Sequence, residues 1–385
     1  MSKPIEASTL ADVQFSQLNY AYGMPVLKAN LKLEPEYFIV EEMIDYSLSG
    51  EGEHLWCWVE KKGQNTEWVA GQLAQSVGIS KRNVGYAGQK DRNAVTRQWF
   101  SLQLPGKEDP DLSSMQIAGV TILDMQRHNR KLQRGELAGN KFTVRLTSIQ
   151  SVNKDEIFSV EQIKTLLTSR LQKIAIQGVP NYFGEQRFGH SMGNLVKGET
   201  FLKQPNTRES NKARRRKSSS NRNQQGMYIS ALRSWMFNVL LSKRIELQNW
   251  NNAILGDVLQ LTKTETFVLG TTELLSELEP RIQSGELLPT GCLFGDGKLE
   301  TQADALGIET EVVKSYQAWC DALADRRVMQ DRRALRLVAE DLSWSFSEDE
   351  GTGLNLLLEF NLPAGSFATM LLREVLLTED KGYKD

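Results

Sequence analysis

Cysteine and histidine are scarce in this chain of 385 residues, which contains three of each. The six residues are scattered: Cys57, Cys292, Cys320, His54, His128 and His190. No two cysteines form a CxxC pair, and no two histidines have the spacing of a metal-binding helix. We therefore expect neither a disulfide scaffold nor a Cys/His metal site, and we expect a reduced, intracellular protein without a bound metal.

Long apolar runs and nucleotide-binding loops are also missing. No apolar stretch approaches the roughly 18–20 residues that a membrane-spanning helix needs, and the N-terminus lacks the pattern of a secretory signal. The sequence contains no GxxxxGK[ST] phosphate loop. We expect a cytoplasmic protein that needs no membrane and no cofactor, and no obligatory protein partner is evident.

The charges are almost balanced overall but unevenly distributed. A net charge of −2 excludes a uniformly basic surface of the kind that coats nucleic acid. Three windows are nevertheless strongly basic, with net charges of +4 at 81–97, +5 at 127–145 and +6 at 208–222. Aromatic residues, among them Tyr86, Trp99 and Phe142, interleave with the first two windows. This combination favours a polyanion with stackable bases, namely RNA or DNA.

The pattern of apolar residues predicts an α+β fold. Strands are expected at 36–43, 54–60, 83–87, 97–104, 117–124 and 141–147, with one helix starting at Asn65 or Thr66 and stopping at Gly78. After about residue 160 the pattern becomes helical, and from 333 strands return. Residues 203–226 have the polar composition of a loop. A helical middle between strand-rich ends predicts an inserted domain.

Asp91 is the candidate catalytic carboxylate. It occupies a turn between two predicted strands, directly flanked by Lys90 and Arg92. Nearby cations keep a carboxylate ionised even when a substrate partly desolvates it. An ionised carboxylate can act as nucleophile or general base, although the same pattern also fits an ordinary turn residue.

The segment around Asp91, GYAGQKDRNAVTRQW at 85–99, resembles the signature of the tRNA pseudouridine synthase D family. Further blocks occur in the family's order: EPEYFIVEE at 34–42, HNRKL at 128–132, GNKF at 139–142, GVPNYFGEQRFG at 178–189, RSWMFN at 233–238, RALR at 333–336 and LPAGSFAT at 362–369. The resemblance as a whole spans about residues 28–375.

The resemblance implies a pseudouridine synthase catalytic domain, a concave antiparallel sheet with flanking helices, carrying an inserted and mainly helical family-specific domain. The expected parts are residues 1–177 and 331–385 for the catalytic domain and 178–330 for the insertion. The implied reaction converts uridine 13 in the D-arm of tRNA to pseudouridine, and the implied partner is tRNA.

The resemblance also assigns roles to residues. Asp91 is the catalytic carboxylate, and Lys32 matches a lysine near it, with Lys28 as a rival if the register slips. The other implied residues bind the uridine: Phe142 stacks on the flipped uracil, Asn140 pairs with its polar edge, and Phe38 and Phe367 wall the pocket.

Two other readings compete with a synthase. A non-catalytic RNA-binding protein would use the same basic surface without turnover, but binding alone gives no reason for a carboxylate among cations. A glycoside or nucleoside hydrolase would normally need a second acid, and it would release free uracil. We also expect the basic stretch 208–222 to contact tRNA phosphates.

Overall fold

The computed structural model describes residues 13–111, 117–204 and 219–381, apart from 263 and 265. The chain forms two compact units. The first, which we call the sheet unit, consists of Pro25–Leu171, Ala339–Ala368 and Val375–Asp385. The second, the helical unit, consists of Met1–Met24, Gln172–Val338 and Thr369–Glu374. Each unit is therefore assembled from separate stretches of the chain. The expected domain boundaries, at 177/178 and 330/331, remain a prediction.

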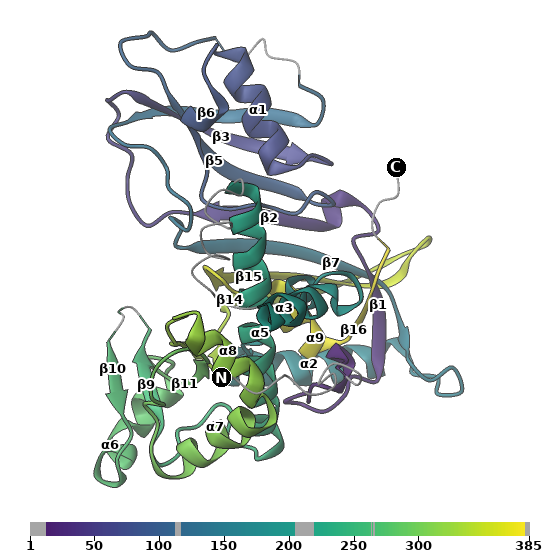
Figure 1. Cartoon of the computed structure of the whole chain (residues 1–385). Helices are drawn as coiled ribbons and strands as arrows, with labels where there is room; N and C mark the ends of the chain where they lie inside the picture. Colours follow the sequence, from purple (N-terminus) through teal and green to yellow (C-terminus); the bar gives the residue numbers. More distant parts are fainter. Residues whose placement is uncertain (1–12, 112–116, 205–218, 263, 265, 382–385) are drawn as a thin grey trace. The chain divides into compact units, whose positions relative to one another are not determined.

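A ten-stranded sheet forms the sheet unit (Figure 1). Its central path runs in the order β14-β15-β7-β2-β5-β3-β6, with β1, β4 and β16 attached beside it. The strands are β1 (Leu27–Leu31), β2 (Phe38–Met43), β3 (His54–Lys62), β4 (Val84–Gly85), β5 (Val95–Gln103), β6 (Val120–His128), β7 (Gly139–Ser151), β14 (Glu340–Asp349), β15 (Gly353–Pro363) and β16 (Leu377–Asp380).

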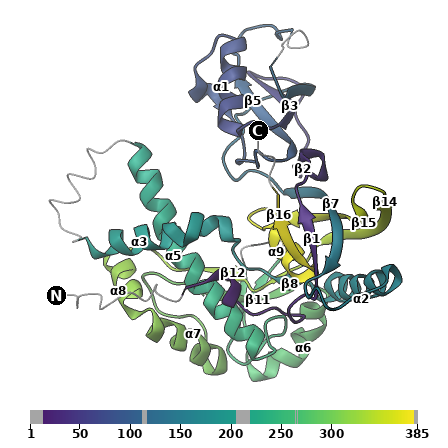
Figure 2. The ribbon, with the colours of Figure 1, turned by 90° about the vertical axis from the view of Figure 1, so that its right-hand side faces the viewer.

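Most neighbouring strands of this sheet are antiparallel, as expected, but two pairs are parallel. β2 runs parallel to β5, and β1 runs parallel to β16 with Lys28 opposite Leu377. Figure 2 shows β1 and β16 side by side. The observed sheet is therefore mixed, within the α+β class that the sequence predicts.

Helix α1 (Thr66–Ser76) covers one face of β3 and β5, as both ribbon views show (Figures 1 and 2). Its apolar positions recur at helical spacing, so Val69, Ala70, Leu73 and Ala74 are all buried. They pack against alternate residues of the strands beneath, including Cys57 and Phe100. The predicted helix is confirmed, including its end next to Gly78, whose φ is 64°.

The helical unit combines helices with short strands. Its helices are α3 (Gly193–Lys203), α5 (Ser219–Glu246), α6 (Thr272–Gln283), α7 (Ala303–Ser315), α8 (Gln317–Asp325) and α9 (Ala368–Val375), and α2 (Val160–Gln177) contains the boundary between the units. β9 (Val258–Leu261), β10 (Phe267–Leu269), β11 (Leu287–Leu293) and β12 (Asp331–Ala334) form a four-stranded sheet, and β8 (Val179–Pro180) pairs with β13 (Arg336–Leu337).

The predicted loop at 203–226 is wrong in part. Helix α3 continues to Lys203, and α5 begins at Ser219. A helix already nucleated by a packed segment extends at little cost into polar sequence, which local composition does not reveal. Residues 208–218 of the basic stretch lie outside the described residues, and residues 219–222 belong to α5.

Candidate active site

Five strands of the sheet unit place one row of side chains on a common face. Lys61 on β3 is paired with Thr96 on β5, Thr96 with Val40 on β2, Val40 with Phe142 on β7, and Phe142 with Phe360 on β15. Residues directly opposite each other in neighbouring strands project from the same side of a sheet. This row therefore brings a lysine and two phenylalanines to one surface from segments 300 residues apart.

The next rows complete this face. Glu42 lies opposite Asn140, and Asn140 lies opposite Leu362 at the end of β15. On the other side of the central row, Phe38 lies opposite Val144. The predicted residues Phe38, Asn140 and Phe142 are thus neighbours on one face, as their two-residue spacing within β2 and β7 requires.

Asp91 lies in the turn between β4 and β5, and its carboxylate forms an ion pair with Lys32. Its Oδ1 accepts a 3.0 Å hydrogen bond from the backbone N–H of Asn93, which fixes the side chain. The Asp91 side chain remains 36% exposed, whereas that of Lys32 is 5% exposed. The carboxylate therefore has a buried cation behind it and an open side in front.

The Lys32 ammonium is positioned by several groups of the sheet unit. It lies 4.7 Å from the ring centroid of Phe38 and 3.9 Å from a carboxylate oxygen of Asp380. Lys28, the rival candidate, is paired instead with Glu379 at 2.9 Å. Lys32 is the lysine that contacts Asp91, and its backbone has the left-handed conformation (φ 57°) that non-glycine residues seldom adopt.

The charge state of Asp91 follows from these neighbours. Partial burial by itself would raise the pKa of Asp91, but the Lys32 ammonium, the N–H of Asn93 and the charge of Lys61 together lower it below its ordinary value. The flanking cations expected to do this lie elsewhere: Lys90 faces Glu42, and Nε of Arg92 donates to the Gly63 carbonyl at 2.9 Å. The cations that favour the ionised form of Asp91 are thus two lysines that are distant in sequence, Lys32 and Lys61.

Lys61 is a site residue that sequence reasoning missed. Its side chain is fully buried, and Nζ donates to the backbone carbonyls of Asp91 at 2.7 Å and of Lys90 at 3.4 Å. Burial lowers the pKa of Lys61 to about 8, although the negative charge of Asp91 opposes this shift. The available signal was a lysine on the inward face of a strand whose other inward residues, Leu55, Cys57 and Val59, are apolar.

A second buried ion pair lies beside the site. Nζ of Lys90 is 3.3 Å from Oε2 of Glu42 and also donates to Oδ1 of Asn140. Burial raises the pKa of Glu42 and lowers that of Lys90, while each charge counteracts the other's shift. Glu42 was also missed, and it too is a charged residue on the inward face of an apolar strand. The pair orients the Asn140 amide.

Buried polar side chains hold the turn that carries Asp91. Thr66, the first residue of α1, accepts a 3.0 Å hydrogen bond from the Lys90 N–H and donates to Gln98 at 3.1 Å. Gln98 in turn donates to the Gly88 carbonyl at 3.0 Å. With Lys61 beneath, the turn is fixed from three elements, and such rigid support is what a catalytic carboxylate requires.

The aromatic residues differ in exposure. Phe142 is 6% exposed, with its ring stacked on Phe360 at a centroid distance of 5.3 Å and edge-on to Phe38 at 6.2 Å. Phe367 is half-buried and follows β15, on the segment that leads to α9. All six predicted site residues belong to the sheet unit.

Other residues of the matching blocks have structural partners in the helical unit. Arg336 donates to backbone carbonyls of Ile176, Gln177 and Ile282. Tyr182 and Phe188 are buried, as expected of core residues. These contacts hold secondary-structure elements of the helical unit together.

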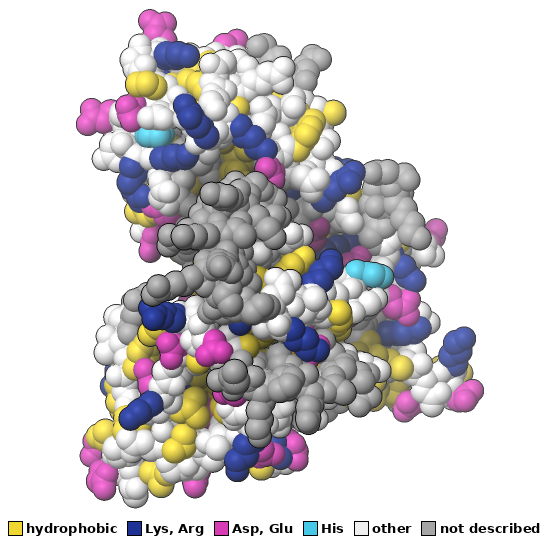
Figure 3. All heavy atoms as spheres, viewed as in Figure 1, with side chains coloured by type: hydrophobic (Ala, Val, Ile, Leu, Met, Phe, Trp, Pro, Cys, Tyr) yellow, Lys and Arg dark blue, Asp and Glu magenta, His cyan; other side chains and the backbone are white. Residues whose placement is uncertain are grey.

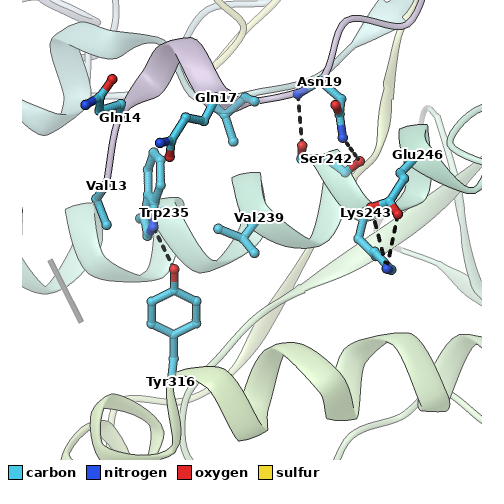
Figure 4. A pocket seen from close by; sticks show the side chains of 11 residues that line it. Val13, Gln14, Gln17, Asn19, Trp235, Val239, Ser242, Lys243, Glu246 and Tyr316 are labelled. Atoms are coloured by element: carbon cyan, nitrogen blue, oxygen red, sulfur yellow. Dashed lines mark hydrogen bonds and ion pairs between the residues drawn. The ribbon is translucent and has the colours of Figure 1, made fainter. Parts of the chain in front are cut away.

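A separate cavity of about 360 Å³ lies in the helical unit, between the segment Val13–Asn19 and α5 (Figure 4). Its polar side chains are largely paired with one another: the Trp235 indole donates to the Tyr316 hydroxyl at 3.0 Å, and Asn19 bonds Ser242. The cavity contains none of the predicted site residues. It is a packing feature of this unit.

The described part of the chain shows neither a metal-binding cluster nor a membrane-spanning helix. Among residues 13–111, 117–204 and 219–381, no group of three or more His, Cys, Asp or Glu side chains is placed to hold a metal ion. Within the same ranges, no helix is long and apolar enough to cross a membrane.

The chain is similar to known proteins over almost its whole length. A sequence model of the family described as "tRNA pseudouridine synthase D (TruD)" matches residues 14–204 and 200–375. A tRNA pseudouridine synthase D of Hydrogenovibrio crunogenus is 45% identical over 94% of this chain and 97% of its own length. One from Pseudomonas aeruginosa strain UCBPP-PA14 is 44% identical over 92% of both chains. A Methanosarcina mazei structure named for the same family superposes with a TM-score of 0.73 at 21% identity, covering 93% of this chain and 95% of its own, which shows a shared fold.

Proposed function

The chain belongs to the tRNA pseudouridine synthase D family of tRNA-modifying isomerases, and we propose from its site that it converts uridine 13 of tRNA to pseudouridine, with Asp91 as the catalytic carboxylate. The observation that carries the proposal is the pairing of a partly exposed carboxylate with the buried Lys32 ammonium, beside Phe38. A tRNA substrate is met in the cytoplasm, where we expect the protein to act.

The reaction is an isomerisation. The bond between N1 of uracil and C1′ of ribose breaks, the base turns over, and a bond between C5 and C1′ forms. C5 then loses a proton and N1 gains one, so no co-reactant is consumed. An ionised Asp91 can serve either as the nucleophile or as the base that removes a proton. Lys32 favours the charged carboxylate in both cases.

Aromatic and amide side chains provide a place for the flipped base. Removing the uracil from its stack costs a few kcal/mol, which contacts with the protein must offset. One face of the Phe142 ring packs on Phe360, so the uracil would stack against the opposite face, a contact that contributes roughly 1–3 kcal/mol. Phe38 and Phe367 would wall the pocket.

Asn140 would recognise the polar edge of uracil. Because its Oδ1 accepts from Lys90, the amide N–H groups are the ones available to a uracil carbonyl. Lys90 and Glu42 therefore act through Asn140, and Lys61 acts through the backbone of Asp91. These three are positioning residues, because they would touch other site residues rather than the base.

The experiment is a mapping assay on an unmodified tRNA transcript with U13. The transcript is incubated with the wild type, with Asp91→Asn, or with Asp155→Asn, an exposed aspartate of the same unit as a matched control. Pseudouridine is located by carbodiimide labelling and reverse-transcription stops. We expect a stop reporting position 13 with the wild type and the control only, and none on a transcript carrying C13. Tight binding without a stop would contradict the proposal in favour of a binding protein, and free uracil would indicate a hydrolase.

A further inference from the structure

Two basic segments that are remote in sequence meet around one cavity of the sheet unit. The cavity has a volume of about 530 Å³ and does not include the six predicted site residues. Its wall contains four cations and one carboxylate, together with the ring of Tyr86. The lining residues are Glu67, Lys81, Arg82, Val84, Gly85, Tyr86, Lys131, Leu132, Gln133 and Arg134.

Hydrogen bonds hold the two segments to each other and to β5. The Gly135 N–H donates to the Ala87 carbonyl at 2.8 Å, and the Leu132 N–H donates to the Ser101 hydroxyl at 3.0 Å. Nζ of Lys131 reaches across to the Arg82 carbonyl at 2.6 Å. A Cβ at Gly85 would lie 2.5 Å from the Ser101 hydroxyl oxygen and closer still to the Leu132 carbonyl, so only glycine permits this approach.

The four cations of the cavity wall outnumber its one carboxylate, so the wall carries a net positive charge. Glu67 forms an ion pair with Lys81 at 2.9 Å, and Lys81, Arg82 and Arg134 are all exposed. Figure 3 shows Lys and Arg side chains gathered on the face of this unit over β3 and β5. Like charges around a concave surface create a local positive potential that attracts anions from solution. Tyr86, half-buried against Phe100 at a centroid distance of 5.9 Å, adds a flat ring to the wall.

The cavity adjoins the turn that carries Asp91. Tyr86 and Asp91 are only five positions apart, and a chain of that length spans at most about 18 Å. On the other side, Glu67 follows Thr66, whose hydroxyl oxygen accepts the hydrogen bond from the Lys90 N–H. An anion seated in the cavity is therefore within a few nucleotides of a base that reaches Asp91.

We propose that this cavity is a docking site for the phosphate backbone of the tRNA, engaged next to the reacting uridine and built from Lys81, Arg82, Lys131 and Arg134. The proposal rests on the proposed function, because it takes tRNA as the ligand. Arg and Lys bind phosphate oxygens without reading sequence, so the site sets affinity and register on the RNA. The counterions released from the RNA make its contribution dependent on salt.

The test compares two double variants that remove the same charge. Lys131→Gln/Arg134→Gln removes two cations of the cavity, and Lys154→Gln/Lys164→Gln removes two from other positions of the sheet unit. The dissociation constant for unmodified tRNA is measured between 50 and 300 mM salt, with thermal unfolding as a check on folding. We expect the cavity variant to bind more weakly and to reduce the slope of log K against log salt by about 2, roughly 1 per phosphate contact. The control variant should keep the slope of the wild type.

Equal slopes for both folded variants would overturn the docking site. Pseudouridine mapping at position 13 in the same samples separates this result from a failure of the proposed function. A reduced slope in the cavity variant, together with a wild type that leaves U13 unmodified, would support the docking site and reject U13 as the target. An unchanged slope in the cavity variant, together with normal conversion of U13, would reject the docking site and support U13 as the target. Should the cavity variant unfold, the single variants Lys131→Gln and Arg134→Gln give the same test, with an expected slope change of about 1 each.

Discussion

The buried Nζ of Lys61 donates a 2.7 Å hydrogen bond to the backbone carbonyl of Asp91. Complete burial of a charged lysine lowers the stability of the folded state by several kcal/mol unless neighbouring groups compensate the charge. Here the compensation comes from two carbonyl groups of the turn that carries the candidate catalytic residue, and from the Asp91 charge itself. The relationship links the position of the carboxylate to a fully buried residue of β3.

Lys61→Met tests this link. We expect kcat to fall while KM for tRNA stays unchanged, because the turn loses its support and Asp91 loses a nearby positive charge. Burial lowers the pKa of Lys61 to about 8 from an ordinary 10.5. Between pH 8 and pH 10.5, the Lys61 side chain is therefore protonated in the unfolded chain and neutral in the folded chain. The free energy of unfolding of the wild type should therefore rise with pH across this window, and the rise should be smaller in the variant.

Lys62→Met is the matched control for that experiment, because Lys62 is the exposed neighbour that pairs with Glu36. The rate of U13 conversion by the wild type should also decline as the pH rises through about 8 and Lys61 loses its charge. The pH–rate profile of Lys61→Met should lack this decline. A wild-type pH profile reproduced unchanged by Lys61→Met would exclude a positioning role.

Lys32→Met should move the acidic limb of the pH–rate profile to higher pH. The Lys32 ammonium counteracts the desolvation that by itself would raise the pKa of Asp91. Without it, the carboxylate is protonated at higher pH and the active form is lost earlier on acidification.

Lys28→Met controls for the loss of a nearby lysine, since Lys28 on β1 pairs with Glu379 instead of Asp91. Its pH–rate profile should match that of the wild type. If Lys28→Met shifted the acidic limb and Lys32→Met did not, the assignment of Lys32 would be wrong.

Phe142→Leu separates base stacking from packing. Phe142 and Phe360 stack on each other and both are almost fully buried, so either ring replaced by leucine loses a similar packing contact. Only Phe142 is expected to touch uracil, a contact of roughly 1–3 kcal/mol or about a 5- to 150-fold change in kcat/KM.

The measurements are kcat/KM on the U13 transcript and the midpoint of denaturant unfolding, with Phe360→Leu as control. We expect similar unfolding midpoints and a much larger kinetic loss for Phe142→Leu. Equal kinetic losses would assign Phe142 to the core alone.

The ion pair of Glu42 and Lys90 predicts a non-additive result. Either single change, Glu42→Leu or Lys90→Met, leaves a buried charge unpaired and should lower the free energy of unfolding by about 3–5 kcal/mol. The double variant removes both charges and should recover most of this loss. Its activity should stay low, because Asn140 no longer has the Lys90 hydrogen bond that orients it. Urea unfolding and the mapping assay measure the two effects, and additive losses of stability would contradict the pairing.

Gly85→Ala should disturb the basic cavity without changing any charge. The added Cβ meets the Leu132 carbonyl, so the segment 131–134 must move away from β4. We expect weaker tRNA binding with a flatter salt dependence.

Gly71→Ala is the control, because Gly71 lies on helix α1 with open space around the new Cβ, and it should leave tRNA binding unchanged. A Gly85→Ala protein that binds tRNA like the wild type would show that the close approach at Gly85 is dispensable.

Local patterns predicted the elements of this fold better than their pairing. The alternation of Phe142, Val144 and Leu146 identified β7, and the four-residue spacing of Val69 and Leu73 identified α1. The parallel pairing of β2 with β5 could not be predicted this way, because it depends on the path of the intervening chain. The helical start of α5 was missed because composition reports the propensity of a segment and not its attachment to a packed helix.

The candidate site was predictable through its motifs but not through its electrostatics. The resemblance identified Lys32, Asp91, Asn140 and the phenylalanines, and the fold brings Lys32 into contact with Asp91 across 59 positions. The flanking cations Lys90 and Arg92 were the wrong source of the charge effect on Asp91, since adjacent residues of a turn can point in different directions. Lys61 and Glu42 would have been found by asking why a charge occupies an inward position of an otherwise apolar strand.

The pairing of β1 with β16 has a consequence for how the protein is made. Lys28 is among the first residues of the sheet to leave the ribosome, whereas its partner Leu377 follows 349 positions later (377 − 28). The strand that carries Lys28 therefore has one edge without its partner until the residues of β16 have been synthesised. A chain that stops early, through a damaged message or a premature stop codon, lacks the closing strand next to Lys32.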